Sequence, residues 1–245
     1  MHDAPAYYAR HGGPLADWWT VLHPPYTLWH LSYVVLGAAM APTLDWWALA
    51  LSVVAFFLAV GIAAHALDES AGRPLGTGIT DRSLTAVAVL ALVGAVLVGL
   101  YGALVHQSGN WPVLASIPVG AVLVVGYNLE LWGGRLHNDL TFALAWGGFP
   151  VVVGYLAQAP APSLRGVAAA AVATTGGVAM TYAQRFLSTP ARYLRRDTRD
   201  IFGSAIALDG QLLNLNRHVL LAPIERTLRA LSWAVPLLAV AALLA

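Results

Sequence analysis

The stretch WWALALSVVAFFLAVGIAAHAL, residues 46–67, decides the fold class, because it contains no Asp, Glu, Lys or Arg. About 20 mostly apolar residues are enough for a helix to cross a hydrocarbon core of roughly 30 Å. Only 10% of the whole chain is charged, and its mean hydropathy is strongly positive at +0.67. The sequence therefore predicts an integral membrane protein.

Hydropathy predicts six further spans around this run and an all-α fold, a polytopic membrane helix bundle that forms a single domain over residues 1–245. Residues 1–24, rich in tyrosine and tryptophan, are predicted to form an interfacial segment, and residues 184–229 a cytoplasmic amphipathic segment with an interfacial helix at 202–222. The seven predicted spans are Tyr26–Ala41, Trp46–Leu67, Leu84–Val105, Pro112–Leu131, Leu140–Ala157, Val167–Ala183 and Ala230–Ala245.

Arginine is distributed very unequally between the two sides that these spans define. The side of the N-terminus also holds the connections 68–83, 132–139 and 184–229, whereas the other side has only the turns 42–45, 106–111 and 158–162. Arg165 is the one arginine on the side of the turns. Because basic residues accumulate in cytoplasmic loops, we expect a bacterial or archaeal cell membrane protein with a cytoplasmic N-terminus and a cytoplasmic site.

Polar residues from three predicted spans converge near the cytoplasmic side. His30 lies in the first span, and the fourth ends near Tyr127 and Glu130, followed by His137 in a short connection. The second span ends in His65-Ala-Leu-Asp68-Glu69, whose spacing predicts that the imidazole and both carboxylates share one helical face. Strongly polar groups at membrane depth normally face the bundle interior or an aqueous cavity. The pattern predicts a functional site there, although carboxylates at helix ends are also commonly just solvated.

Three sequence segments resemble the UbiA superfamily of intramembrane prenyltransferases. The opening helix of that family is similar to the run Thr27-Leu-Trp-His-Leu-Ser-Tyr-Val-Val-Leu-Gly-Ala-Ala-Met-Ala. The run from His65 through Asp68, Arg73 and Pro74 to Thr80 falls at its first Asp-rich motif and the following Arg-Pro loop. Tyr127 and the run Leu140-Thr-Phe-Ala-Leu-Ala-Trp-Gly-Gly-Phe-Pro resemble its Tyr-containing loop and Gly-x-x-Pro helix. The resemblance covers about residues 25–190 and implies a UbiA-like bundle.

The resemblance also implies an activity, namely metal-dependent transfer of a polyprenyl group from its diphosphate to a lipid-soluble or aromatic acceptor. Asp68 and Glu69 would hold Mg²⁺, with Asp197 and Asp200 as a second set. Asp68, Glu69 and Tyr127 would be catalytic, and the substrate-binding residues would be Arg73, Gln184, Arg192, Arg195 and Arg196. The chain departs from the family, because the positions of the first Asp-rich motif read Ala64, His65, Asp68 and Gly72, and only Asp68 keeps a carboxylate.

Two alternatives remain open. Imidazole together with carboxylate suits iron or zinc better than Mg²⁺, which favours a membrane metalloenzyme with a di-iron or zinc site that acts on a lipid. Its predicted ligands are His30, His65, Asp68, Glu69, Glu130 and His137. The second alternative is a non-catalytic lipid-binding subunit. The expected partners are the lipid bilayer and a membrane lipid or isoprenoid substrate, with no nucleic acid, and the oligomeric state is left open.

Overall fold

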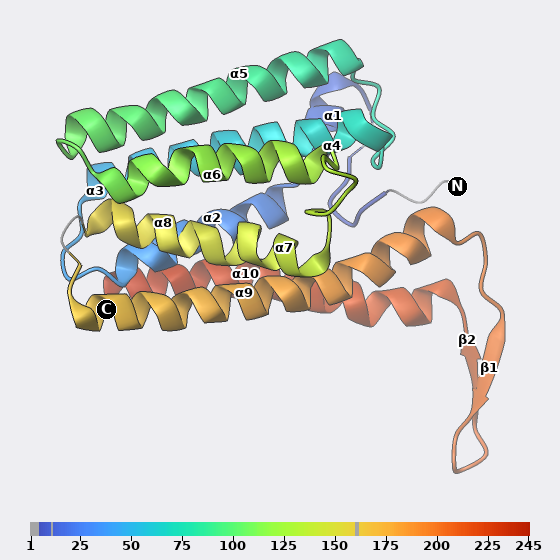
Figure 1. The fold of residues 1–245 in the computed structure, drawn as a ribbon. Helices are drawn as coiled ribbons and strands as arrows, with labels where there is room; N and C mark the ends of the chain where they lie inside the picture. Colours follow the sequence, from blue (N-terminus) through green and yellow to red (C-terminus); the bar gives the residue numbers. More distant parts are fainter. Residues whose placement is uncertain (1–4, 11, 160–161) are drawn as a thin grey trace.

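A computed structural model describes residues 5–10, 12–159 and 162–245 and shows a bundle of mostly parallel and antiparallel helices (Figure 1). Residues 1–4 and 11 of the predicted interfacial segment, and residues 160–161 of the last predicted turn, lie outside the described residues. The elements are α1 (Pro14–Val21), α2 (Pro24–Ala39), α3 (Trp46–Phe56), α4 (His65–Gly72), α5 (Asp81–Leu100), α6 (Trp111–Asn128), α7 (Asp139–Ala143), α8 (Phe149–Gln158), α9 (Leu164–Arg192), β1 (Gly203–Ile206), β2 (Leu212–Leu215) and α10 (Arg217–Leu244).

Six helices in the described part of the chain are long and apolar enough to cross a membrane. Several of them run through π-helical turns, such as Phe57–Ala64 between α3 and α4 and Leu144–Gly148 between α7 and α8. The six are Trp46–Gly72, Asp81–His106, Trp111–Asn128, Asp139–Gln158, Leu164–Asp197 and Arg217–Leu244. The protein is thus an integral membrane helix bundle by length and composition.

The first predicted span corresponds to α2, which is shorter than the others. Its 16 residues extend about 24 Å at 1.5 Å per residue, less than a typical hydrocarbon core. α2 packs directly against α8: a Cβ on Gly37 would lie 2.0 Å from the carbonyl oxygen of Val151, and one on Gly154 would lie 2.2 Å from that of Val34. Only glycine permits this approach of two backbones, which fixes α2 and its His30 in the middle of the bundle.

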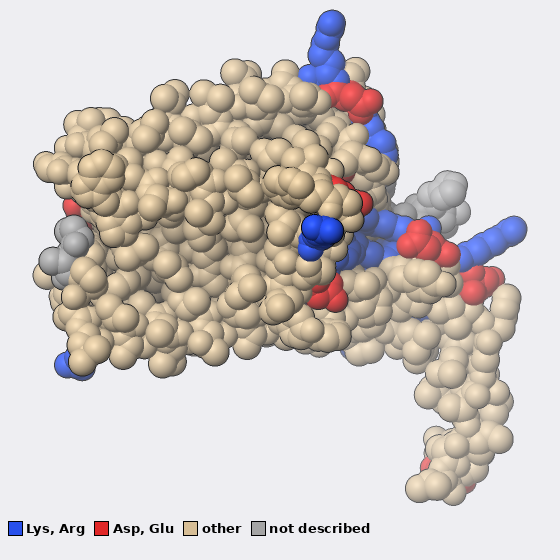
Figure 2. All heavy atoms as spheres, in the orientation of Figure 1, with Lys and Arg blue, Asp and Glu red and all other residues tan. Residues whose placement is uncertain are grey.

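Charged residues gather at one end of the bundle, and the rest of the face shown in Figure 2 is almost free of them. The described part of the chain begins at this charged end and finishes at the opposite end (Figure 1). This separation of charge is the one that the sequence predicts. The assignment of the charged end to the cytoplasm stays a prediction from the arginine distribution.

The predicted interfacial helix at 202–222 is wrong. β1 and β2 form an antiparallel hairpin in this region, with Gly203 opposite Leu215 and Ile206 opposite Leu212. The reason is local: Asp209-Gly210 is a turn sequence, and Gly210 takes a positive φ of 81°. α9 also continues well past the predicted end of its span. The segment 184–229 therefore consists of two protruding helix ends joined by a hairpin.

Candidate functional site

A cavity of about 180 Å³ opens at the charged end of the bundle, bordered by α2, α4, α9, α10 and the connection between α6 and α7. Most of the residues predicted for the site line it, although they come from segments far apart in the sequence: His30, His65, Asp68, Tyr127, His137, Gln184, Arg192, Arg195 and Arg196. The predicted convergence of several helices on one cavity is therefore present in the structure.

Glu69 does not face this cavity, although the sequence groups it with Asp68. Its side chain is fully buried, and its carboxylate accepts hydrogen bonds from the N–H of Leu75, the N–H of Thr77 and the hydroxyl of Thr77, each at 2.9 Å. The carboxylate thereby holds the loop that follows α4. Helical spacing alone does not distinguish a side chain that faces a cavity from one that fastens a neighbouring loop.

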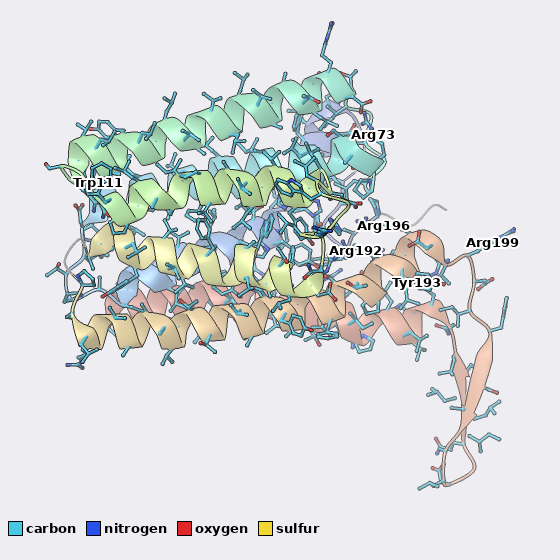
Figure 3. The ribbon with its side chains drawn as sticks, viewed as in Figure 1. Arg73, Trp111, Arg192, Tyr193, Arg196 and Arg199 are labelled. Atoms are coloured by element: carbon cyan, nitrogen blue, oxygen red, sulfur yellow. The ribbon has the colours of Figure 1, made fainter. Side chains whose placement is uncertain are left out.

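Arg73 belongs to the same loop. It ends α4 with a positive φ of 52°, and its guanidinium donates to the carbonyl oxygen of Ile79 and to the carboxylate of Asp81. These bonds account for its position at the edge of the bundle (Figure 3). The structure therefore assigns Arg73 a loop contact and does not place it on the cavity wall.

The other predicted carboxylates lie outside the cavity as well. Glu130 is 65% exposed, and its Oε1 lies 3.7 Å from Nδ1 of His137. Asp197 ends the π-helical turn after α9, and Asp200 lies in the following loop. The carboxylates predicted as metal ligands therefore do not converge on Asp68.

Four histidines line the cavity, and three of them lie on or beside α2 and α4. Nδ1 of His30 bonds to the carbonyl oxygen of Trp146 at 3.0 Å, and Nδ1 of His65 bonds to that of Gly61 at 3.2 Å. His23, which the prediction omitted, packs against His65 with ring centroids 4.5 Å apart. The spacing of seven residues between His23 and His30, two helical turns, is a signal that could have found it. Burial, followed by the positive charges of neighbouring groups, lowers the pKa of His23 well below its usual value.

Several polar groups on the cavity wall have no partner within the described residues. The hydroxyl of Tyr127 and Oε1 of Gln184 are both buried, at 4% and 3% residue exposure, and neither makes a hydrogen bond. Asp68 likewise accepts no hydrogen bond from this part of the chain. A buried polar group without a partner costs about 1–3 kcal/mol, and such exceptions in a folded protein call for an explanation. A polar ligand in the cavity would supply the missing partners.

The described residues that line the cavity carry more positive than negative charge. Arg185 pairs with Asp139 at 2.8 Å, and Arg195 pairs with Glu225. Arg192 and Arg196, by contrast, form no direct ion pair among the described residues, and the one carboxylate that acts on both at longer range is that of Asp68. They lie close together beside the end of α9, facing the bundle (Figure 3). Two unneutralised guanidinium groups favour an anion, and phosphate oxygens fit their fork of donors.

An apolar groove meets this cavity inside the bundle. It has a volume of about 110 Å³ and lies between α3, α5, α6 and α8, lined almost entirely by aliphatic and aromatic side chains. Trp146 lines both the groove and the cavity. Its ring lies 4.7 Å from that of Tyr127 and 5.5 Å from that of Phe142, between centroids. Trp146, within a cluster of three aromatic rings, thus lies between the polar cavity and the apolar groove.

The described residues do not fit either predicted metal site. No group of three or more histidine, aspartate or glutamate side chains among them lies close enough to hold one ion. Among the described residues, Asp68 is the one cavity carboxylate without an ion pair, since Glu225 is paired with Arg195. A magnesium site of two acidic clusters would need several such carboxylates, because Mg²⁺ prefers oxygen ligands.

Comparisons with family models, with curated proteins and with solved structures found no match to this chain. The likeness to the UbiA superfamily therefore remains a prediction from the sequence.

Proposed function

We propose that this protein is a UbiA-like membrane transferase that moves a prenyl group from its diphosphate to an acceptor at the charged end of the bundle. One observation carries the proposal: a cavity with two arginines that form no ion pair among the described residues adjoins an apolar groove, with Trp146 lining both. A substrate with an anionic head and a long apolar tail matches both compartments at once.

The aromatic cluster lies where the reacting carbon of such a substrate would sit. In the reaction, the bond between the first prenyl carbon and the diphosphate oxygen breaks, and its electron pair leaves with the diphosphate. The positive charge that develops on the prenyl carbon is stabilised by the faces of Tyr127, Phe142 and Trp146. A nucleophilic atom of the acceptor then forms the new bond and loses a proton.

The other cavity residues have separate roles in the proposed reaction. Arg192 and Arg196 stabilise the charge that grows on the leaving diphosphate, and no step is assigned to a metal ion, since the residues do not fit the acidic clusters. Asp68 is the proposed base that takes the proton of the acceptor, because its carboxylate has no competing hydrogen bond. Gln184 and Tyr127 offer their unpartnered polar atoms to the head of either substrate.

The test is turnover by the purified protein in lipid nanodiscs. Prenyl diphosphates of several chain lengths are supplied with extracted membrane lipids as the acceptor pool, and released diphosphate and prenylated lipid are measured. We expect release of diphosphate, reduced at least about 100-fold in Asp68→Asn, with binding of the prenyl diphosphate retained. Glu130→Gln removes an exposed carboxylate outside the cavity and is the matched control, with unchanged turnover.

The same preparation tests the alternatives. Binding of prenyl diphosphates without turnover would indicate a non-catalytic lipid-binding subunit. Elemental analysis that finds stoichiometric iron or zinc, lost in His65→Ala, would overturn the proposal in favour of the metalloenzyme. Failure of every chain length to bind would remove its basis altogether.

A further inference from the structure

A second hollow lies beside the cavity, outside the bundle proper. It has a volume of about 690 Å³ and is bordered by the end of α9, the following loop and the first turns of α10. Arg195 and Glu225 line both the hollow and the cavity. Their ion pair therefore lies between the two spaces, and the hollow is a separate site.

The hollow is strongly basic. Five arginines line it together with His218. Among the described residues the only carboxylates on its wall are Asp200 and Glu225, which leaves an excess of three positive charges with a neutral histidine. Like charges held in one concave surface repel each other unless a multivalent anion lies between them. The five arginines are Arg195, Arg199, Arg217, Arg226 and Arg229.

The wall of the hollow is held in place by contacts that leave other guanidinium groups available. Arg217 donates to the carbonyl oxygens of Thr198 and Arg199, which fixes the loop after α9 against the start of α10. Asn216 caps α10 by accepting the N–H of Val219 at 3.0 Å. Arg199 and Arg226 are exposed and form no ion pair within the described residues, and Arg199 extends away from the bundle (Figure 3).

We propose that this hollow is a binding site for a phosphate group, separate from the cavity. The guanidinium groups of Arg199 and Arg226 border one concave space whose other three arginines are engaged with Glu225, backbone carbonyls and the Tyr7 ring. Two planar donor forks in a surface with excess positive charge match the many oxygens and multiple charges of phosphate better than they match a single carboxylate. The hollow lies one ion pair away from the position at which the proposed function places diphosphate. The phosphate site does not depend on the proposed function, because the residues of the hollow form it by themselves.

Two sources of phosphate can reach the hollow. The 28 residues of α10 extend about 42 Å at 1.5 Å per residue, about 12 Å more than a hydrocarbon core of roughly 30 Å. Its arginine-rich first turns therefore extend through the headgroup layer toward water. A lipid headgroup can enter from the membrane side and a free phosphate or diphosphate from the water side.

The test compares two double variants that lose the same charge. Arg199→Gln with Arg226→Gln removes two exposed guanidinium groups of the hollow, whereas Arg82→Gln with Arg165→Gln removes two exposed ones elsewhere. Inorganic diphosphate is titrated into the detergent-purified full chain by calorimetry. In parallel, the protein is placed in nanodiscs of phosphatidylglycerol or phosphatidylcholine and then transferred into detergent. Native mass spectrometry identifies the lipids that it retains.

We expect the affinity of the hollow for phosphate to fall by at least about 10-fold in the hollow variant, with diphosphate binding in the cavity unchanged, and the control variant to match the wild type at both sites. Loss of diphosphate binding identifies a free anion as the ligand, and loss of selectively retained phosphatidylglycerol identifies a lipid. Equal effects in both variants, or no binding of either probe to the wild type, overturn the proposal. Since this readout is binding, it can succeed or fail independently of prenyl transfer.

Discussion

The cavity at the charged end and the polar cluster around Asp45 at the opposite end differ in how their polar side chains are paired. At the end opposite the charged one, Asp45 caps α3 and pairs with His106 at 2.6 Å, and Gln158 exchanges two hydrogen bonds with the backbone of Asp45. Asn110 bonds to Gln107 and to the carbonyl oxygen of Leu156, each at 2.8 Å. At the charged end, the cavity presents an arginine pair, a carboxylate and two buried polar atoms without partners.

This difference distinguishes polar groups that stabilise the fold from polar groups that are available to bind a ligand. A closed network satisfies its members and stabilises the loops that it connects. Groups without partners are kept at a cost in stability, which is expected where binding needs them. Replacing a residue of the closed network should lower stability and leave binding unchanged. Replacing a group without a partner should weaken binding and leave stability nearly unchanged.

The largest effect on stability is expected for Glu69→Ala. The substitution leaves three donors of the loop after α4 unpaired inside the protein, so the free energy of unfolding should fall by about 3–5 kcal/mol. Thermal unfolding in detergent measures the loss. Asp68→Ala, one residue earlier, should leave the unfolding midpoint nearly unchanged. A larger loss of thermal stability in Asp68→Ala than in Glu69→Ala would mean that Asp68 is the structural carboxylate.

The next effect concerns binding. Arg192→Gln removes one of the two unneutralised cavity arginines, and a charge-assisted hydrogen bond contributes about 1.5–3 kcal/mol. Affinity for a prenyl diphosphate should fall by about 10–100-fold, with no loss of thermal stability. Arg185→Gln is the comparison, because that arginine is already paired with Asp139 and should contribute less to binding. Equal losses in both variants would count against a specific anion site.

A smaller effect is expected at the opposite end. Asp45→Ala removes the cap that accepts the N–H groups of Trp47 and Ala48, together with the pair to His106. Hydrogen bonds from these two N–H groups and from His106 outweigh the effect of burial and lower the pKa of Asp45. Stability should fall by about 1–2 kcal/mol, and binding of prenyl diphosphate by the folded fraction should stay the same. Weakened binding would show that the two ends are coupled.

The smallest effect is a pH dependence from His23. Its pKa is lowered in the folded protein, chiefly by burial and further by His65, Arg196, Arg192 and His30, and its Nδ1 contacts the hydroxyl of Tyr8. The unfolded chain takes up the proton near pH 6.5, so stability is complete above that pH and declines below it. The decline is at most about 1.4 kcal/mol per pH unit. Unfolding midpoints of the wild type and His23→Gln between pH 8 and pH 5.5 should converge as the pH falls, and parallel curves would contradict the prediction.

Much of the architecture could be predicted because it follows from composition. Runs without charge such as residues 46–67 must lie in lipid as helices, and the arginines must then remain outside the membrane. The hairpin was missed because the apolar residues of 202–222 resemble a helical pattern, whereas Asp209-Gly210 imposes a turn. His23 was missed because a histidine outside a predicted span carries no hydropathy signal.

The amino-acid sequence by itself determined a membrane bundle whose charge collects at one end, and it identified most of the residues that line the cavity there. The tertiary structure alone decided which of these residues are committed to other contacts. Asp68 and Glu69 are neighbours with the same chemistry, yet one faces the cavity and the other holds a loop. The physical reason is that helical periodicity sets the direction of a side chain relative to its own helix, whereas its partners depend on which other segments pack against that helix.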